Sequence, residues 1–263
     1  MSAWVAAELR DTSLGEALRE PRRLFRDPRA RVLKDHARTA VAALSFDGRD
    51  LYLKHWKTHR WYRPFVWLAT GTPAAQSLAS AARLERAGFR VPERLGATES
   101  RALGVPRDCW LVTAAVVDAQ PLGRFWREQA AGWPVRRRAA LLAAVAAEFA
   151  RFHAAGFYSR DANADNFLVR WSAAGRPEFH YLDLENVRFL GRVSRRRRVK
   201  NLVQLYRPVR GMIGRNDRLR WLRAYFGAHP SACRDWLAEL AVVDERKERE
   251  YATRSGRRSA AAS

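Results

Sequence analysis

The sequence predicts an α+β fold with two lobes, a small β-rich N-terminal lobe and a mainly helical C-terminal lobe. Two strand-like runs in the first half are joined by Asp47-Gly48, and Asp-Gly between such runs is a strong hairpin signal. Helical hydrophobic spacing begins near Arg136 and dominates again from Val199 onward. We therefore expect an N-lobe at residues 1–117, a C-lobe at 118–253 and a disordered basic tail at 254–263.

Composition favours a folded protein with an anionic partner. The 263 residues are 48% hydrophobic and 11% aromatic, which excludes general disorder. The formal net charge of +22 indicates nucleic acid, an anionic membrane surface, phosphorylated glycans or nucleotides as partners. Two cysteines cannot build a disulfide framework or a zinc site by themselves, so a reduced cytosolic compartment is expected.

No membrane insertion is expected. Glu8 and Asp11 lie where a signal peptide would need an apolar core. No stretch approaches the roughly 18 apolar residues of a membrane span. A peripheral position on a membrane stays open.

The predicted hairpin comprises residues 38–46 and 49–56. In its second strand Leu51 and Leu53 point to one face, while Tyr52 and Lys54 point to the other. A lysine beside an aromatic residue in an apolar strand is a candidate functional cation. The alternative is an edge lysine that extends to water.

The rest of the N-lobe contains a helix and a buried strand. Residues 74–87 form the helix, because Pro73 lies near its start and Gly88 follows its end. The continuously apolar run 109–117 predicts a buried strand. Residues 118–121 are expected to form the linker between the lobes.

The C-lobe begins with a helix at residues 136–155, which ends before Gly156. Strands are expected at 167–171 and 178–184, and helices follow from Val199. His153 lies on the apolar helix and is expected to be structural, since no second His or Cys stands at metal spacing.

The segment between the long helix and these strands contains Arg160-Asp161, then four residues, then Asn166. Asp183 follows at the expected end of the second strand. Phosphoryl transfer needs a carboxylate to accept the proton of the attacking hydroxyl, and oxygen ligands for magnesium. This pattern suits both needs. The alternative is a surface turn, where Asp and Asn are favoured for local hydrogen bonding.

At this point the chain resembles the lipopolysaccharide core kinases, kinase-like enzymes that phosphorylate Kdo or heptose sugars of the inner core. The resemblance spans about residues 31–226 and depends on LYLKHW, ARLERAGFRVPERLGA, LVTAAV, FHAAGFYSRDANADNFLV, YLDLENVRF and GRVSRRRRVKNLVQL. It implies a protein-kinase-like fold, ATP with Mg²⁺, and a sugar hydroxyl as acceptor. By matching positions, Asp161 is the catalytic base, Asn166 and Asp183 are metal ligands, and Lys54 binds the nucleotide phosphates.

Several residues depart from the kinase pattern. The turn Lys34-Asp35-His36-Ala37 lacks the glycines of a phosphate loop. The predicted helix offers Lys54 only Glu85, close to its C-terminal end, so the partner of Lys54 cannot be named. Glu185 is either a further metal ligand on the strand face of Asp183 or an exposed ion-pairing residue. Asn201 stands where related chains tend to carry an Asp that braces the catalytic loop.

Two basic surfaces allow more than one interpretation. Residues 54–68 read KHWKTHRWYRPFVWL, and the mixture suits a membrane interface, base stacking on nucleic acid, or packing onto the small lobe. The cluster Arg195, Arg196, Arg197 and Arg198, with Lys200, either grips an anionic acceptor or is a solvated basic face.

The function expected from these observations is an ATP-dependent kinase that phosphorylates a Kdo or heptose hydroxyl of the lipopolysaccharide inner core. Its partners are then the core glycolipid and an anionic membrane, which it contacts peripherally on the cytoplasmic face. One alternative is a kinase-fold phosphotransferase for another small-molecule hydroxyl. Another is a pseudokinase that binds nucleotide or anionic glycan. Nucleic acid is disfavoured as the partner because it leaves the carboxylate motif unexplained.

Overall fold

The computed structural model describes residues 2–227, 236, 238–246 and 249. The chain forms two compact units. The first extends to Asp118 and includes His180–Glu185, and the second comprises Ala119–Phe179 and the chain from Asn186 onward. The division after Asp118 falls within the expected linker at 118–121, but the return of His180–Glu185 to the first unit was not foreseen. The expected tail at 254–263 lies outside the described residues.

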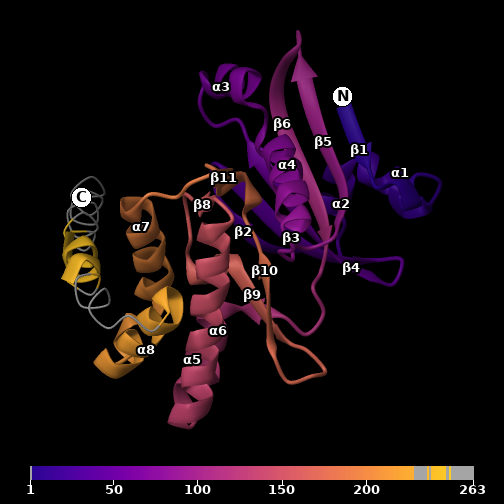
Figure 1. Cartoon of the computed structure of the whole chain (residues 1–263). Coiled ribbons are helices and arrows are strands. Elements are labelled where there is room, and N and C mark those ends of the chain that lie inside the picture. The colour runs from indigo at the N-terminus through magenta and orange to yellow at the C-terminus, as the bar shows by residue number, and fades with distance from the viewer. Residues whose placement is uncertain (1, 228–235, 237, 247–248, 250–263) are drawn as a thin grey trace, which may run out of the picture. The chain divides into compact units, whose positions relative to one another are not determined.

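The first unit contains a six-stranded sheet in which neighbouring strands are antiparallel (Figure 1). In spatial order the strands are β1 (Ser2–Val5), β5 (Arg94–Ala102), β6 (Val105–Ala114), β4 (Arg49–Lys57), β3 (Thr39–Phe46) and β2 (Arg31–Asp35). Asp47 and Gly48 both have positive φ, 48° and 74°, which fits the tight turn expected of a two-residue hairpin. The predicted hairpin is confirmed.

β4 lies inside the sheet, between β6 and β3. The alternative of an edge lysine at Lys54 is therefore wrong. The bounds of one predicted strand also differ. The strand expected at 109–117 runs from Val105 to Ala114, because Leu103-Gly104 forms a hairpin turn with φ of 51° and 76°. The strand β5, which follows the helix at 74–87, was not predicted.

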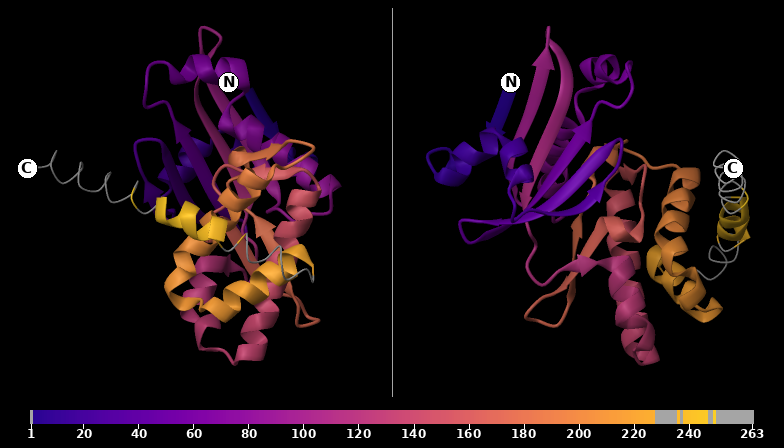
Figure 2. Two further views of the ribbon diagram at one scale, coloured as in Figure 1. Left: turned by 60° about the vertical axis from the view of Figure 1, so that its left-hand side comes forward. Right: turned by 180° about the vertical axis from the view of Figure 1, so that it is seen from behind.

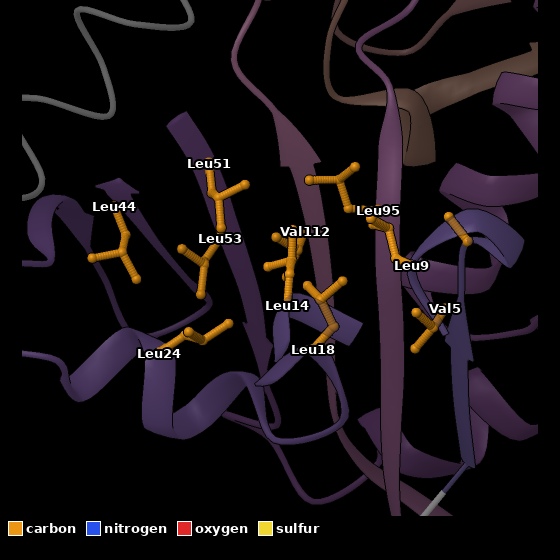
Figure 3. Close-up of a cluster of buried hydrophobic side chains, with 11 residues drawn as sticks. Val5, Leu9, Leu14, Leu18, Leu24, Leu44, Leu51, Leu53, Leu95 and Val112 are labelled. Carbon is orange, nitrogen blue, oxygen red and sulfur yellow. The ribbon is translucent and has the colours of Figure 1, made fainter. Parts of the chain in front are cut away.

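One face of the sheet is covered by η1 (Ala7–Leu9), α1 (Ser13–Arg19) and α2 (Pro21–Arg26). Thr12 caps α1, since its Oγ1 accepts a hydrogen bond from the amide of Gly15 at 3.0 Å. The buried leucines of these helices pack on leucines of β3, β4 and β5, as Figure 3 shows. The core members are Val5, Ala6, Leu9, Leu14, Leu18, Leu24, Leu44, Leu51, Leu53, Leu95 and Val112. These N-terminal helices were not predicted.

The other face carries α3 (Arg63–Thr70) and α4 (Pro73–Arg86), with a core of Trp56, Trp67, Ala74, Ala97, Cys109 and Leu111 (Figure 2). Thr72 caps α4 through a 3.3 Å bond from the amide of Ala75, and Gly88 follows the helix with φ 77°. The predicted helix at 74–87 is confirmed. Lys54 belongs to this face, because it alternates with Leu53 and lies two residues before Trp56.

The second unit is mainly helical, as expected. Its helices are α5 (Leu122–Glu128), α6 (Val135–Ala154), α7 (Arg195–Tyr206) and α8 (Arg215–Phe226), with short turns η2 (Ala130–Gly132), η3 (Ala164–Asn166) and η5 (Arg207–Met212). Residues 236 and 238–246 are also helical. The apolar stripe of α6 is buried at Leu141, Leu142, Val145, Phe149 and Phe152, which confirms the helical pattern.

Short strands complete the second unit. β8 (Phe157–Ser159) pairs with β11 (Val187–Phe189), and β7 (Gln120–Pro121) pairs with β9 (Phe167–Trp171). Two residues of the expected linker thus form a strand. β10 (Pro177–Tyr181) continues the β7–β9 sheet and ends with two residues of the first unit. The strand expected at 178–184 therefore stops at Tyr181, and η4 (Leu184–Asn186) follows it.

No helix among the described residues is long and apolar enough to cross a membrane.

Candidate active site

Lys54 is positioned by the centre of the sheet in the first unit. Its backbone pairs with Val41 of β3 on one side and Leu111 of β6 on the other. The side chain is only 19% exposed, so its ammonium group cannot rely on water. A buried cation of this kind needs opposite charge close by.

Two carboxylates of the same unit meet that need. The Nζ of Lys54 donates to Oδ1 of Asp183 at 2.6 Å and to Oε1 of Glu185 at 2.7 Å. Burial alone would lower the pKa of Lys54, but the charges of Glu185 and Asp183 outweigh it, so that pKa is raised. The lysine therefore stays protonated, which a phosphate-binding role requires.

Glu185 is the missing partner of Lys54 that sequence reasoning could not name. Its side chain is 15% exposed, so the expectation of an exposed residue is wrong. The other alternative placed Glu185 on the strand face of Asp183, and this placement is also wrong. Glu185 lies in η4, not on a strand face shared with Asp183. Burial raises the pKa of Glu185, and Asp183 adds to the rise while Lys54 opposes it.

Trp56 closes this cluster on the sheet side. Its Nε1 donates to Oε1 of Glu185 at 3.2 Å, and its ring centroid lies 4.8 Å from the Nζ of Lys54. The indole thus binds both members of the ion pair, through a hydrogen bond to the carboxylate and a cation–π contact to the lysine. In the sequence, the only signal for this contact was an aromatic residue two positions after Lys54, on the same face of the strand.

Asp183 adopts a left-handed backbone conformation, with φ 50°. Such a φ is uncommon outside glycine and occurs most often at Asn and Asp. The preceding strand is held in the first unit, because the amide of Tyr181 donates to the carbonyl of Arg90 at 3.0 Å. The rings of Tyr181 and Phe89 also pack edge to face, 5.5 Å apart. Asp183 and Glu185 are thereby fixed at Lys54.

The second unit contains the Arg160–Asn166 loop. Gly156 follows the C-cap of α6 and has a φ of 82°. A Cβ here would lie 2.6 Å from the carbonyl oxygen of Gly191, so only glycine fits. β8 then pairs with β11, and the amide of Arg160 donates to the carbonyl of Asn186 at 2.9 Å. The loop therefore begins at a fixed point.

Asn201 braces this loop from α7. It is fully buried, and its Nδ2 donates to the carbonyl of Ser159 at 2.6 Å while its Oδ1 accepts from the amide of Ser159 at 3.1 Å. A carboxylate could accept from the amide but could not donate to the carbonyl. The departure from Asp at this position therefore keeps the brace and changes only its hydrogen-bond pattern.

His153 extends the same network into the helical core. Its Nε2 lies 3.2 Å from Oδ1 of Asn201, and its Nδ1 lies 2.6 Å from the hydroxyl of Tyr225. Desolvation lowers the pKa of His153 to about 4. A neutral ring that donates through Nε2 and accepts from Tyr225 satisfies both contacts. The structural role expected for His153 is confirmed.

Asp161 and Asn166 lie at the two ends of the loop. Asp161 is exposed and its amide donates to Oγ of Ser159 at 3.2 Å. Asn166 is the last residue of η3, and its Nδ2 donates to the carbonyl of Asp161 at 3.0 Å. This hydrogen bond uses the amide nitrogen of Asn166 and leaves its side-chain oxygen, the atom that could bind a metal, outside the contact.

The arginine cluster occupies the first turn of α7. Arg195 donates to Glu239 at 2.7 Å and lies over the ring of Trp236. Arg198 donates to the carbonyl of Val193 at 3.1 Å. Arg196 and Arg197 are exposed, and Arg197 faces the ring of Tyr158. Arg196 and Arg197 are thus better placed than Arg195 to meet an external anion.

Each unit therefore groups part of the predicted site. The first unit brings together Lys54, Asp183 and Glu185, and the second brings together Asp161 and Asn166. Among the described residues, no three His, Cys, Asp or Glu side chains are grouped as a metal site. Magnesium commonly takes only one or two carboxylates and completes its shell with phosphate oxygens and water.

Comparison with known proteins gives concordant similarities. The model of the lipopolysaccharide kinase (Kdo/WaaP) family matches residues 16–225. The chain is 28% identical over 218 residues to the lipopolysaccharide core heptose(I) kinase WaaP of Pseudomonas aeruginosa, across 78% of this chain and 80% of that protein. The structure of WaaP in complex with acyl carrier protein superposes with a TM-score of 0.69 and 22% identity, and it covers 95% of this chain and 99% of that one. The structural likeness confirms the predicted kinase-like α+β fold.

Proposed function

Because this chain belongs to the lipopolysaccharide kinase (Kdo/WaaP) family, whose members transfer phosphate to a sugar hydroxyl, we propose that its acceptor is a heptose or Kdo hydroxyl of the inner core. The family implies ATP as the phosphate donor. The similarity to a heptose(I) kinase, at 28% identity, favours heptose over Kdo as the acceptor sugar.

The observation that carries this proposal is the placement of Lys54. The ammonium group is buried in the sheet, protonated, and held by Asp183 and Glu185 at 2.6 and 2.7 Å. In kinases a strand lysine binds the α and β phosphates and is oriented by a carboxylate. A lysine with only a structural role in the sheet would not need two carboxylates.

Glu185 is proposed to replace the helix glutamate that usually orients this lysine. Other candidates on α4 are engaged elsewhere. Glu85 pairs with Arg94 at 2.8 Å, and Ser77 donates to the carbonyl of Pro73 at 2.8 Å. Gln76 donates to the carbonyl of Gly71 at 2.9 Å. Glu185 therefore supplies the orienting charge from the chain segment next to Asp183.

Asp161 is proposed as the catalytic base. Its carboxylate accepts the proton of the attacking sugar hydroxyl while the new bond forms between that oxygen and the γ-phosphorus. The bond from the γ-phosphorus to the oxygen of ADP breaks in the same transfer. The hydrogen bonds of Asn201 to Ser159 and of Gln204 to the carbonyl of Arg160, at 3.0 Å, hold the loop that presents Asp161.

Asp183 and Asn166 fit the oxygen chemistry of Mg²⁺. Asp183 is 36% exposed, so its second oxygen is accessible beside the one that contacts Lys54. Asn166 offers its side-chain oxygen, because its nitrogen is used by the carbonyl of Asp161. When bound, magnesium would neutralise phosphate charge and orient the γ-phosphate.

The acceptor is proposed to be gripped by Arg196 and Arg197. Inner-core sugars that carry carboxylates or phosphates match the fork of a guanidinium group. Replacing both arginines with Glu should raise the KM for the acceptor at least tenfold and leave the KM for ATP unchanged. Equal changes in both constants would contradict an acceptor role.

The decisive experiment is transfer of labelled phosphate from ATP, with magnesium, to purified lipopolysaccharide core. Asp161→Asn and Asp183→Asn are the test variants, and Asp118→Asn is a matched control at an exposed carboxylate. Loss of transfer in both test variants, with the control active, supports the proposal. Bound ATP without transfer to this acceptor would favour the alternatives of another hydroxyl acceptor or a pseudokinase.

A further inference from the structure

The first unit exposes an apolar stripe along α3 and the turn before it. Trp61, Phe65 and Leu68 are 82%, 57% and 56% exposed. Phe65 and Leu68 are three residues apart and share one face of α3, and Trp61 lies in the turn before the helix, while Pro64 and Trp67 are buried. The basic and aromatic segment 54–68 is thus divided: part of it packs, as one interpretation expected, and part of it faces outward.

A further exposed apolar residue, Leu103, lies at the same end of the unit. The β5–β6 turn presents Leu103, which is fully exposed and has a left-handed φ of 51°. A leucine in this position gains nothing from burial and has an unfavourable backbone conformation. Thr58 donates to the carbonyl of Arg107, which joins this hairpin to the segment before α3. Figure 2 shows the turn and α3 at one end of the unit.

The segments that carry this stripe are rich in cations, two of which are paired with acids elsewhere in the sheet, Lys57 with Asp35 and Arg101 with Glu99. Residues 57–72 include Lys57, Arg60 and Arg63 without any Asp or Glu, and residues 101–107 include Arg101 and Arg107 without any Asp or Glu. Partial desolvation, with the charges of Arg38, Arg63 and Arg60, lowers the pKa of His59. Arg38 lies beside this segment, because the amide of Lys57 donates to the carbonyl of Arg38 at 2.9 Å.

We propose that α3 and the β5–β6 turn form a docking surface for an anionic lipid bilayer. Exposed Trp, Phe and Leu side chains with flanking cations match the acyl and headgroup layers of such a surface. The Lys and Arg residues of both segments favour an anionic surface over a neutral one as the occupant. The inference rests on the proposed glycolipid acceptor, since that substrate lies in a membrane.

The orientation follows from the same geometry. Trp67 packs with Trp56 and Cys109 in the core of the first unit, so the docking helix is anchored directly to the strand that carries Lys54. Trp61, Phe65 and Leu68 would enter the interface, while Arg60 and Arg38 would meet lipid phosphates. The amphipathic helix thus lies on the bilayer without spanning it.

The test is sedimentation of the full chain with vesicles of phosphatidylglycerol or phosphatidylcholine. We expect binding to phosphatidylglycerol vesicles that falls at least tenfold in Trp61→Ser/Phe65→Ser/Leu68→Ser. Val135→Ser/Met212→Ser, which changes exposed apolar residues of the second unit, is the matched control and should bind like the unchanged chain. Arg38→Glu/Arg60→Glu should lose binding to the anionic vesicles as well.

A second readout separates insertion from charge attraction. Brominated acyl chains should quench Trp61 fluorescence in the bound protein, and Trp61→Phe should reduce this quenching while vesicle binding persists. Phosphate transfer to delipidated, water-soluble core sugar should be unchanged in the stripe variant, so that failure of docking and failure of the kinase activity are distinguishable. Vesicle binding unaffected by the triple replacement would overturn the proposal. So would a dimer of the unchanged chain that the same replacement makes monomeric, since a second copy would then cover the stripe.

Discussion

At the scale of single residues, the main feature is an ammonium group shared by two carboxylates. Lys54, Asp183 and Glu185 carry one positive and two negative charges in a half-buried site. The extra negative charge suits a divalent cation with nucleotide phosphates. Within this cluster Glu185 and Asp183 have different surroundings, because Glu185 is more buried and also bonded to Trp56.

We predict that Glu185→Gln lowers kcat/KM by about tenfold to a hundredfold, that is, by roughly 1.4–2.7 kcal/mol. The amide keeps the shape and a hydrogen bond but removes the charge that orients Lys54. A steady-state titration of ATP measures this loss. Glu85→Gln on α4 is the control and should retain activity. An unchanged kcat/KM in Glu185→Gln would mean that Asp183 alone orients Lys54.

His153 predicts a pH dependence of stability. Its pKa is about 4 in the folded protein and near 6.5 when unfolded, so the unfolded chain binds more protons between these values. Stability is then fully present above pH 6.5 and falls as the pH drops towards 4, by up to about 3 kcal/mol.

The measurement is urea unfolding at pH 7 and pH 5, compared between the unchanged chain and His153→Gln. Glutamine can still donate to Asn201 and accept from Tyr225, but it does not titrate. The difference in unfolding free energy between the two pH values should shrink in His153→Gln. An equal pH dependence in both proteins would show that other groups carry it.

At the scale of elements, the site depends on where helices and strands end. The α6–β8 turn at Gly156 fixes the start of the Arg160–Asn166 loop. The β5–β6 and β3–β4 turns likewise hold the central strands in register. Among these turns, the need for glycine is strongest at Gly156. Its backbone is left-handed, and a Cβ there would also clash with the carbonyl of Gly191.

We predict that Gly156→Ala destabilises the protein by about 2–4 kcal/mol and reduces transfer by displacing the loop. Gly175→Ala is the matched control. That glycine also has positive φ, 68°, but has open space where a Cβ would lie. It should cost only about 1 kcal/mol. Urea unfolding of the two variants gives the comparison, and equal losses would exclude the contact with Gly191 as the cause.

At the scale of the whole molecule, the first unit is discontinuous in sequence. It includes His180–Glu185 as well as the N-terminal residues up to Asp118. Tyr181 is 1% exposed and packs on Phe89, while Asp183 and Glu185 neutralise Lys54. The N-terminal segment by itself therefore lacks part of its own core and the partners of a buried charge.

We predict that a fragment of residues 1–118 shows no cooperative thermal transition, because Lys54 is left unpaired at a cost of about 3–5 kcal/mol. Lys54→Met should partly restore the transition in the fragment, since it removes the unpaired charge. The same replacement in the full chain should not stabilise it. Circular dichroism melts test this, and a fragment as stable with lysine as with methionine would contradict it.

Local patterns were sufficient to predict several features. Asp47-Gly48 predicted the hairpin, the spacing in α6 predicted its buried face, and the loop motif with Asp183 predicted the family. The N-terminal helices α1 and α2 were missed because each is short and their apolar residues have meaning only against the sheet. The site roles of Asp161, Asn166 and Asp183 stay predictions.

The sequence by itself determined the fold class, the family and the set of chemically competent residues, because hydrophobic period, turn residues and motif spacing are properties of neighbouring positions. Tertiary structure alone decided that Lys54 lies in a central strand, that Glu185 binds it, and that Asn201 braces Ser159. These contacts join residues more than 40 positions apart. They depend on which strands pair and which helix packs where, and no local pattern encodes that.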